Sequence, residues 1–410
     1  MVGPMARTMA PTLVRLDEVQ AARERIAGFL RRTPTDPADT ISRLAGRVVL
    51  LKPEHLQRTG SFKIRGAANF MAGLPPGGEV VAGSAGNHAQ GVALAATLTG
   101  RRATLFMPRG APLPKRMASR EYGAHVVLVE DAVDECMVQA GIYAEQRGAV
   151  LVPPFDDPAV IAGQGTIGLE ILEEAPDIEA IVVPVGGGGL LSGIAAAARG
   201  LRPDLRVFGV QPEGAAAMAR SLEAGRPVSV DEPRTMADGV ALKRPSALTV
   251  AHAAALVEGV VTVSEEEISR AMLILLERAK AVVEPAGALA VAALLAGRIP
   301  GSGPAVAVVS GGNLDPMLLT KLIEHGLSAA GRYLVLRVVL DDRPGALHRL
   351  TGALAEMDLN VLAVEHHRSG VELPLDAVEV IVTLETRDPE HRLEVADSLR
   401  AMGHRVEQLG

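Results

Sequence analysis

The chain has 410 residues, of which 48% are hydrophobic and 22% charged, a balance typical of a globular protein of about two or three domains. Its net charge of −7 and its aromatic content of 2% argue against binding to nucleic acid or to an anionic membrane. The single cysteine, Cys136, excludes an intrachain disulfide and a cysteine-rich metal site.

Targeting signals are not visible in the sequence. The beginning of the chain lacks the run of about 7–15 apolar residues that characterises a secretory signal. A membrane-spanning helix requires about 18 or more apolar residues in a row, and the sequence contains no such run. We therefore expect a cytoplasmic protein that has no membrane partner.

Between residues 12 and 325, short apolar runs alternate with helical stretches. The runs predict strands at 48–51, 103–107, 125–129, 181–185, 207–210 and 305–309, and the stretches between them predict helices that include 89–98, 190–199 and 268–283. This alternation is typical of an α/β fold with mainly parallel sheets flanked by helices. A segment of this length favours two lobes, with a ligand at the carboxyl ends of the strands between them.

The first candidate site is the segment 60–67, Gly-Ser-Phe-Lys-Ile-Arg-Gly-Ala. Its lysine, Lys63, follows Ser61 and Phe62 at the start of a helical stretch. A partly desolvated lysine has a lowered pKa and can form a Schiff base with a carbonyl group. The alternative is an ordinary surface lysine at the start of a helix.

The scarcity of lysine favours a special role for Lys63. Only six of the 41 basic residues are lysines, so the sequence uses arginine wherever positive charge alone is needed. Among the other lysines, we expect Lys115 and Lys243 to be solvated charges, and Lys280 and Lys321 to lie in helices.

The second candidate is the segment 83–89, Gly-Ser-Ala-Gly-Asn-His-Ala, between a strand and a helix. The backbone N–H groups at a helix N-terminus can bind a carboxylate, and Asn87 can donate or accept a hydrogen bond beside it. The alternatives are an ordinary turn in which serine or asparagine caps the helix, and a buried, hydrogen-bonded His88 without a catalytic role.

Two further loops follow predicted strands. Four glycines, Gly186 to Gly189, lie between a buried strand and a helix, where consecutive N–H groups can hold a phosphate. The pattern does not match the sequence motifs for ATP or NAD, and a tight structural turn is the alternative. Ser310 offers a neutral hydroxyl in the loop 310–313, which by itself would be interpreted as a turn.

The last 80 residues have a different pattern. Strands are predicted at 333–340, 360–366, 378–384 and 405–409, with one helix after the turn at 341–345 and a second from the N-cap Asp388 to Met402. The order β-α-β-β-α-β indicates a ferredoxin-like domain, with a boundary near residue 328. This part contains neither lysine nor cysteine, which favours a binding module over a second reaction centre.

The four motifs together require a reactive lysine, a phosphate site, a carboxylate site and a polar group at a strand end. Residues 12–325 resemble the fold-type II pyridoxal-phosphate enzymes, specifically threonine dehydratase (threonine ammonia-lyase), with a small lobe at about 55–155 inserted in a large one. The resemblance rests on residues 57–67, 84–91, 163–166, 186–189, 237–240, 284–288 and 310–313. Residues 331–410, through 342–347, resemble an ACT regulatory domain, a family of amino-acid-binding modules.

The resemblance implies a pyridoxal 5′-phosphate site. Lys63 would be the Schiff-base lysine, Asn87 would contact the 3′-oxygen of the cofactor, and Ser310 its pyridine nitrogen. The other cofactor contacts would come from Phe62, Gly186, Gly187, Gly188, Gly189 and Leu190. The substrate would be surrounded by Ser61, Ser84, Ala85, Gly86 and His88.

The implied reaction is deamination of L-threonine to 2-oxobutanoate and ammonia, and of L-serine to pyruvate. Isoleucine or valine would act as an allosteric effector at the ACT domain, as in isoleucine biosynthesis, and the chain would form a homodimer or homotetramer. Serine dehydratase, hydroxyaspartate dehydratase and serine racemase are alternatives, and an amino-acid sensor with a dead catalytic lobe is the non-enzymatic one. The ACT domain could also be purely structural.

Two departures from the racemase pattern narrow this choice. Serine racemases carry a catalytic serine where this sequence has Ala85, which cannot move a proton, so racemisation is disfavoured. The acidic metal ligands of that branch correspond to Gln211 and Ala217 here, so we expect no metal. Because the acidic residue Glu213 lies nearby, binding of a cation at this place stays open as the alternative.

Overall fold

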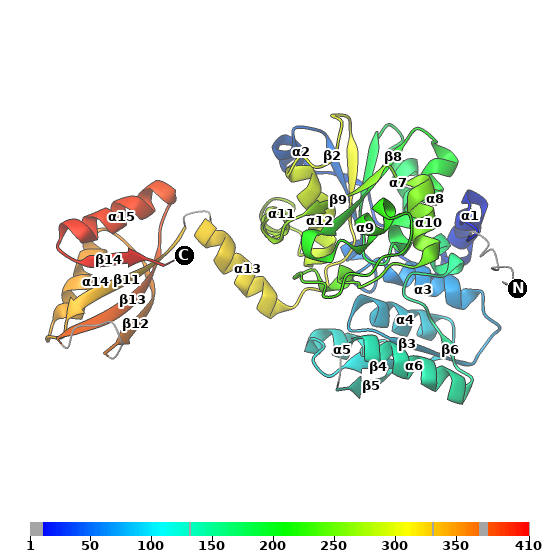
Figure 1. Cartoon of the computed structure of the whole chain (residues 1–410), viewed down its shortest axis with the longest axis horizontal. Helices are drawn as coiled ribbons and strands as arrows, with labels where there is room; N and C mark the ends of the chain where they lie inside the picture. The colour runs from blue at the N-terminus through cyan, green and yellow to red at the C-terminus, as the bar shows by residue number, and fades with distance from the viewer. Residues whose placement is uncertain (1–10, 131–132, 330–331, 369–375, 410) are drawn as a thin grey trace, which may run out of the picture. The chain divides into compact units, whose positions relative to one another are not determined.

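A computed structural model describes residues 11–130, 133–329, 332–368 and 376–409. The chain divides into two compact units after Asp315, and each unit is described by itself. The first unit is built on two mainly parallel sheets (Figure 1). Among the described residues, no helix is both long enough and apolar enough to span a membrane.

The large sheet of the first unit has six strands in the order β1-β2-β10-β7-β8-β9, and all its pairs except β1–β2 are parallel. Its strands are β1 (Asp36–Pro37), β2 (Val49–Pro53), β7 (Ala180–Pro184), β8 (Arg206–Pro212), β9 (Gly259–Val263) and β10 (Ala305–Val309). The helices of this lobe are α1 (Leu16–Ile26), α2 (Asp39–Ala45), α7 (Pro158–Glu174), α8 (Gly189–Leu201), α9 (Ala217–Glu223), α10 (Ala247–Leu256), α11 (Glu265–Arg278) and α12 (Pro285–Leu295). They flank the sheet on both faces, which explains why β7 and β10 are buried at every residue.

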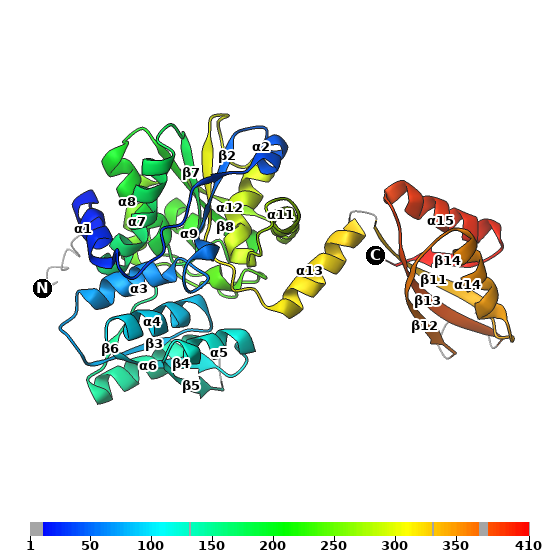
Figure 2. The same ribbon diagram turned by 180° about the vertical axis from the view of Figure 1, so that it is seen from behind.

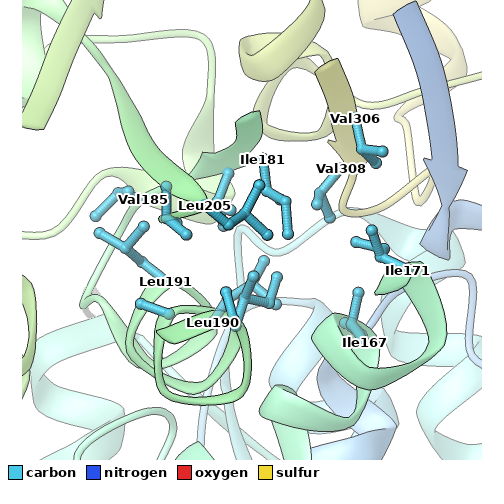
Figure 3. Close-up of a cluster of buried hydrophobic side chains, with 14 of the residues drawn as sticks. Ile167, Ile171, Ile181, Val185, Leu190, Leu191, Leu205, Val306 and Val308 are labelled. Carbon is cyan, nitrogen blue, oxygen red and sulfur yellow. The ribbon is translucent and has the colours of Figure 1, made fainter. Parts of the chain in front are cut away.

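The main hydrophobic core of this lobe lies between the sheet and two of the helices. Figure 3 shows Ile167 and Ile171 of α7 and Leu190 and Leu191 of α8 facing strand residues such as Ile181. All of them are buried, so this core fixes where α8 begins relative to the end of β7.

The small sheet has the order β5-β4-β3-β6 and is parallel throughout. Its strands are β3 (Glu79–Gly83), β4 (Arg102–Pro108), β5 (His125–Val129) and β6 (Val150–Leu151), and its helices are α4 (Asn87–Leu98), α5 (Leu113–Glu121) and α6 (Val133–Arg147). The helix α3 (Lys63–Ala72) packs against α4 of this lobe and against α7 of the large lobe (Figure 2). The α/β class predicted from the sequence is confirmed.

One predicted helix, 268–283, is wrong at its end, because α11 stops at Arg278. Lys280 is therefore not helical but has a left-handed backbone conformation with φ of 56°. The N–H of Ala281 donates to the carbonyl of Leu275 across this residue, at 3.0 Å. This bond reaches back six positions and closes the end of the helix, with lysine and not glycine at the left-handed position.

The second unit contains α13 (Pro316–Ala329), β11 (Tyr333–Asp341), α14 (Ala346–Glu356), β12 (Val361–His367), β13 (Ala377–Glu385), α15 (Pro389–Ala401) and β14 (Arg405–Gln408). Its antiparallel sheet has the order β12-β13-β11-β14, which confirms the predicted ferredoxin-like arrangement. Asp388 caps α15 as expected, accepting a hydrogen bond from the N–H of His391 at 2.8 Å. The domain boundary predicted near residue 328 lies next to residues 330–331, which are outside the described residues.

Candidate active site

Lys63 is placed by contacts between the start of α3 and the loop after β10. The N–H of Phe62 donates to the carbonyl of Ser310 at 3.1 Å, and the N–H of Gly312 donates to the carbonyl of Gly60 at 2.9 Å. Ser61 pairs with Gly311 as an isolated β-bridge. The first and fourth sequence motifs therefore lie together at the carboxyl end of the large sheet, where parallel α/β folds bind ligands.

The amine of Lys63 is held by a backbone carbonyl group. Its Nζ donates to the carbonyl of Pro154 at 2.8 Å and lies 5.3 Å from the centre of the Phe62 ring. Burial lowers the pKa of Lys63 to about 8, although the nearby carboxylate of Glu284 acts in the opposite direction. A substantial fraction of this amine is consequently neutral near pH 8, and a neutral amine is the nucleophilic form.

The second motif forms the turn between β3 and α4. The N–H of Gly86 donates to Oγ of Ser84 at 3.2 Å, and α4 begins at Asn87. The first N–H groups of a helix have no partner inside it and carry the positive end of its dipole. Ser84, Ala85 and Gly86 are only partly buried, so this helix end is accessible to an anion.

His88 is buried, and its Nε2 lies 3.0 Å from the carbonyl oxygen of Val152, to which it donates. Burial, together with the positive charge of Lys63, lowers the pKa of His88 to about 3, although the hydrogen bond to Val152 acts in the opposite direction. The imidazole is therefore neutral, and its Nε2 proton is engaged by the backbone.

The four glycines connect β7 to α8 and are surrounded closely by other segments. A Cβ atom on Gly187 would overlap the Phe155 ring, and one on Gly186 would lie 3.1 Å from Cα of Val240. Gly188 has φ of +93°, a conformation that side chains disfavour. The packing of the protein itself therefore requires glycines here, as the alternative of a tight structural turn predicts. The same turn leaves the N-terminus of α8 as an anion site.

Ser310 is 4% exposed, and its Oγ lies 3.5 Å from the carbonyl of Ala286. Beside it, Asn313 donates to Oδ1 of Asn87 at 2.7 Å, and Asn87 donates to the carboxylate of Glu284. Glu284 and Asn313 were not predicted as functional residues. Their only sequence signal was membership of the segments 284–288 and 310–313 that carry the family resemblance, and these segments say nothing about a contact between them.

The expectation for Lys115 is wrong. Its side chain is buried at the start of α5, and its Nζ lies 3.0 Å from Oδ2 of Asp238. A Cβ atom on Gly86 would lie 3.3 Å from this Nζ, so the ammonium group is adjacent to the turn before α4. Lys243 is exposed as expected and forms an ion pair with Asp134 at 2.6 Å.

Gln211 has a structural role in this chain. Its Oε1 accepts hydrogen bonds from the N–H groups of Met218 and Ala219, both at 3.0 Å, and its Nε2 donates to the carbonyl of Val185 at 3.2 Å. The side-chain amide of Gln211 therefore caps the start of α9 and connects it to Val185, the residue before the four glycines. No group of three or more His, Cys, Asp or Glu in the part of the chain that the structure describes is arranged to hold a metal ion.

Comparisons with known proteins agree with this geometry. Residues 26–311 match the family "Pyridoxal-phosphate dependent enzyme", and residues 334–401 match the ACT domain. The L-threonine ammonia-lyase of Geobacter sulfurreducens is 47% identical over 395 residues, which cover 95% of this chain and 98% of that protein. Among solved structures, a threonine deaminase from T.th. is 44% identical with a TM-score of 0.69, covering 73% of this chain and 99% of that one. Maize serine racemase is 35% identical with a TM-score of 0.72, covering 78% and 99% respectively.

Proposed function

The chain belongs to the pyridoxal-phosphate dependent enzymes and carries an ACT domain, and we propose that it deaminates L-threonine to 2-oxobutanoate and ammonia. The observation that carries this proposal is the amine of Lys63, which has a pKa of about 8 and lies with the loop after β10 at the carboxyl end of the sheet. We propose residues 12–325 as the catalytic domain and 331–410 as the regulatory domain.

The residues of the site fit pyridoxal phosphate. The structure offers an amine of lowered pKa and a glycine-rich helix N-terminus for a phosphate. Oγ of Ser61 is buried and has no hydrogen-bond partner among the described residues. An unpartnered buried polar atom is costly in a finished protein interior, so the Ser61 hydroxyl supports a polar ligand at the site.

We assign the contacts of the cofactor as follows. Lys63 would carry it, Asn87 would face its ring oxygen, Ser310 its ring nitrogen, and Phe62 would line the pocket beside the amine. The phosphate would be held at the start of α8 by Gly186, Gly187, Gly188, Gly189 and Leu190.

When bound, pyridoxal phosphate supplies an electron sink for negative charge at the Cα atom of an amino acid. The protein would do the rest. The N–H groups around Gly86 would hold the substrate carboxylate, with Ser61, Ser84 and His88 around it, and Lys63 would remove the Cα proton as a base. The methyl group of Ala85 cannot carry a proton, which favours loss of the β-hydroxyl group over inversion at Cα.

The lowered pKa of Lys63 predicts how cofactor attachment depends on pH. The neutral amine is the reactive form, so the rate of attachment to cofactor-free protein should rise with pH and level off above about pH 8 to 9. A lysine with an unshifted pKa would continue to accelerate toward about pH 10.4. The rate can be followed by the absorbance of the attached cofactor in stopped-flow mixing. A rate that still rises steeply above about pH 9.5 would contradict the assigned environment.

The substrate assignment is tested by a panel of L-threonine, L-serine and hydroxyaspartate, with release of the keto acid as the measurement. We expect threonine to give 2-oxobutanoate with the highest kcat/KM and serine to give pyruvate more slowly. Similarity to maize serine racemase makes racemisation the second candidate, so residual serine is analysed on a chiral column. Accumulation of D-serine faster than pyruvate would replace the proposed function by the racemase.

We further propose a regulated, cytoplasmic homodimer or homotetramer in which the ACT domain binds a branched-chain amino acid. Support comes from the ACT match at residues 334–401. Isoleucine and valine should therefore change threonine turnover and raise the unfolding temperature, because a ligand that binds only the folded state stabilises it. If neither amino acid changes turnover or the unfolding temperature, the assigned effectors are wrong while the catalytic assignment stands.

A further inference from the structure

The side-chain amide of Asn87 lies in the middle of a short chain of hydrogen bonds. Nδ2 of Asn313 donates to the carbonyl of Thr59 at 2.8 Å and to Oδ1 of Asn87 at 2.7 Å. Nδ2 of Asn87 then donates to Oε1 of Glu284. The chain joins four regions that are far apart in the sequence, before α3, at the start of α4, before α12 and after β10.

Only one orientation of each amide is compatible with this chain. A backbone carbonyl can only accept, so the atom of Asn313 that faces Thr59 must be its nitrogen. That nitrogen also faces Asn87, so the nearest atom of Asn87 must be its carbonyl oxygen. The nitrogen of Asn87 is thereby turned toward Glu284, and one of its two N–H groups is used there. The other N–H group of Asn87 has no acceptor among the described residues and is available to a ligand.

Glu284 is placed close to the reacting amine. Its side chain is 2% exposed, and its carboxyl group and the amine of Lys63 each affect the pKa of the other. The pKa of Glu284 is raised to about 7, mainly by burial, and the negative charge of Asp238 also raises it. The positive charges of Lys115 and Lys63 and the hydrogen bond from Asn87 act in the opposite direction. Oε1 accepts from Asn87 in either protonation state, because a neutral carboxyl group can carry its proton on Oε2.

We propose that Glu284 and Asn313 are positioning residues, which hold the Asn87 amide in one orientation so that its free N–H group donates to the ring oxygen of the cofactor. Neither residue touches the reacting atoms in this role. The proposal rests on the proposed function only in so far as Asn87 faces the cofactor, and it makes no use of the identity of the amino-acid substrate.

The test is a titration of cofactor-free protein with pyridoxal phosphate, read by absorbance and without any amino acid present. The variants are Glu284→Ala, which removes the acceptor, Glu284→Gln, which retains an acceptor oxygen, and Asn313→Asp, which removes the donors at nearly constant shape. Asn360→Asp in the exposed part of the second unit is the matched control. Far-UV circular dichroism and thermal unfolding of each cofactor-free variant establish that it is folded.

Loss of one hydrogen bond to the positioned amide should raise the dissociation constant of the cofactor about five- to thirtyfold for Glu284→Ala and for Asn313→Asp, and alter the absorbance spectrum of the bound form. Glu284→Gln and the control should remain within about twofold of the unaltered protein. Because both residues act on one amide, their effects on cofactor binding should not be independent. The dissociation constant of the double variant should exceed that of either single variant, but its fold-change should be smaller than the product of the two single fold-changes.

Unchanged affinity in Glu284→Ala and Asn313→Asp would overturn the proposal. So would a Glu284→Gln variant as weak as Glu284→Ala, because that result assigns the effect to charge and not to orientation. Fully multiplicative effects in the double variant would also overturn it, since they indicate two independent structural losses. Failure of the protein to deaminate threonine would reject the proposed substrate and leave these three outcomes unaffected.

Discussion

Replacement of Lys63 by alanine is expected to lower threonine turnover by at least about a thousandfold, because the same amine would attach the cofactor and act as the base. The amine lies at the first residue of α3, held by the carbonyl of Pro154, and no other lysine amine is placed at this position in the part of the chain that the structure describes. The absorbance band of the lysine-linked cofactor should disappear at the same time. Steady-state kinetics and an absorbance spectrum of the purified variant measure both effects.

Lys243→Ala is the matched control, since this lysine is exposed and its ion pair among the described residues is with Asp134. It should retain activity within about twofold, as surface substitutions away from special features usually do. Lys63→Arg keeps the positive charge but cannot attach the cofactor, and it should be as inactive as the alanine variant. Normal turnover in either Lys63 variant would reject the assigned role, whereas loss in the control alone would point to the ion pair between the two lobes.

The parts of this fold that could be predicted are those in which local sequence and final burial agree. The strands at 181–185 and 305–309 are apolar at every position because helices cover both faces of their sheet. Parallel strands end at the same edge, so the loops after β7 and β10 had to lie near each other. The site could therefore be located from the order of motifs along the chain, although the reaction was named by resemblance to a family.

The parts that could not be predicted depend on contacts between segments distant in sequence. Lys115 is buried because the turn before α4 and the carboxylate of Asp238, 123 positions later, lie beside it. Glu284 is 197 positions from Asn87, and nothing in either local sequence indicates their hydrogen bond. The reason for the four glycines is also tertiary, since Phe155 and Val240 leave no space for side chains there.

A second feature that only the structure reveals is a buried cluster of charges around Arg65. Its guanidinium group donates to both carboxylate oxygens of Glu54 at 2.8 Å and to both of Glu170, at 2.6 and 2.9 Å. The ammonium group of Lys52 pairs with Glu170 at 2.8 Å, and Thr166 accepts a further bond from Arg65. Arg65 and Lys52 are completely buried, so two cations and two anions share a site with little access to water.

Arg65→Leu should lower the free energy of unfolding by about 3–5 kcal/mol, because it leaves Glu54 and Glu170 buried with only Lys52 to balance them. Burial by itself would raise the pKa of Glu54, and Arg65 is the main reason that this pKa lies below its ordinary value instead. The variant should therefore also lose less stability at acidic pH, where the carboxyl groups are protonated, than at neutral pH. Urea unfolding at about pH 5 and about pH 7.5 measures both effects.

Arg65→Lys and Arg234→Leu separate the contributions of charge and geometry. Arg65→Lys restores the charge but not the paired hydrogen bonds to two carboxylates, so it should recover part of the stability that Arg65→Leu loses. Arg234 pairs with Glu232 on the surface, and its replacement should change the free energy of unfolding by less than about 1 kcal/mol. A loss below about 1 kcal/mol for Arg65→Leu would mean that the leucine packs as well as the ion cluster and that the two carboxyl groups become neutral at little cost. The cluster joins β2, α3 and α7, so its loss should also loosen α3 and slow the reaction of Lys63 two residues away.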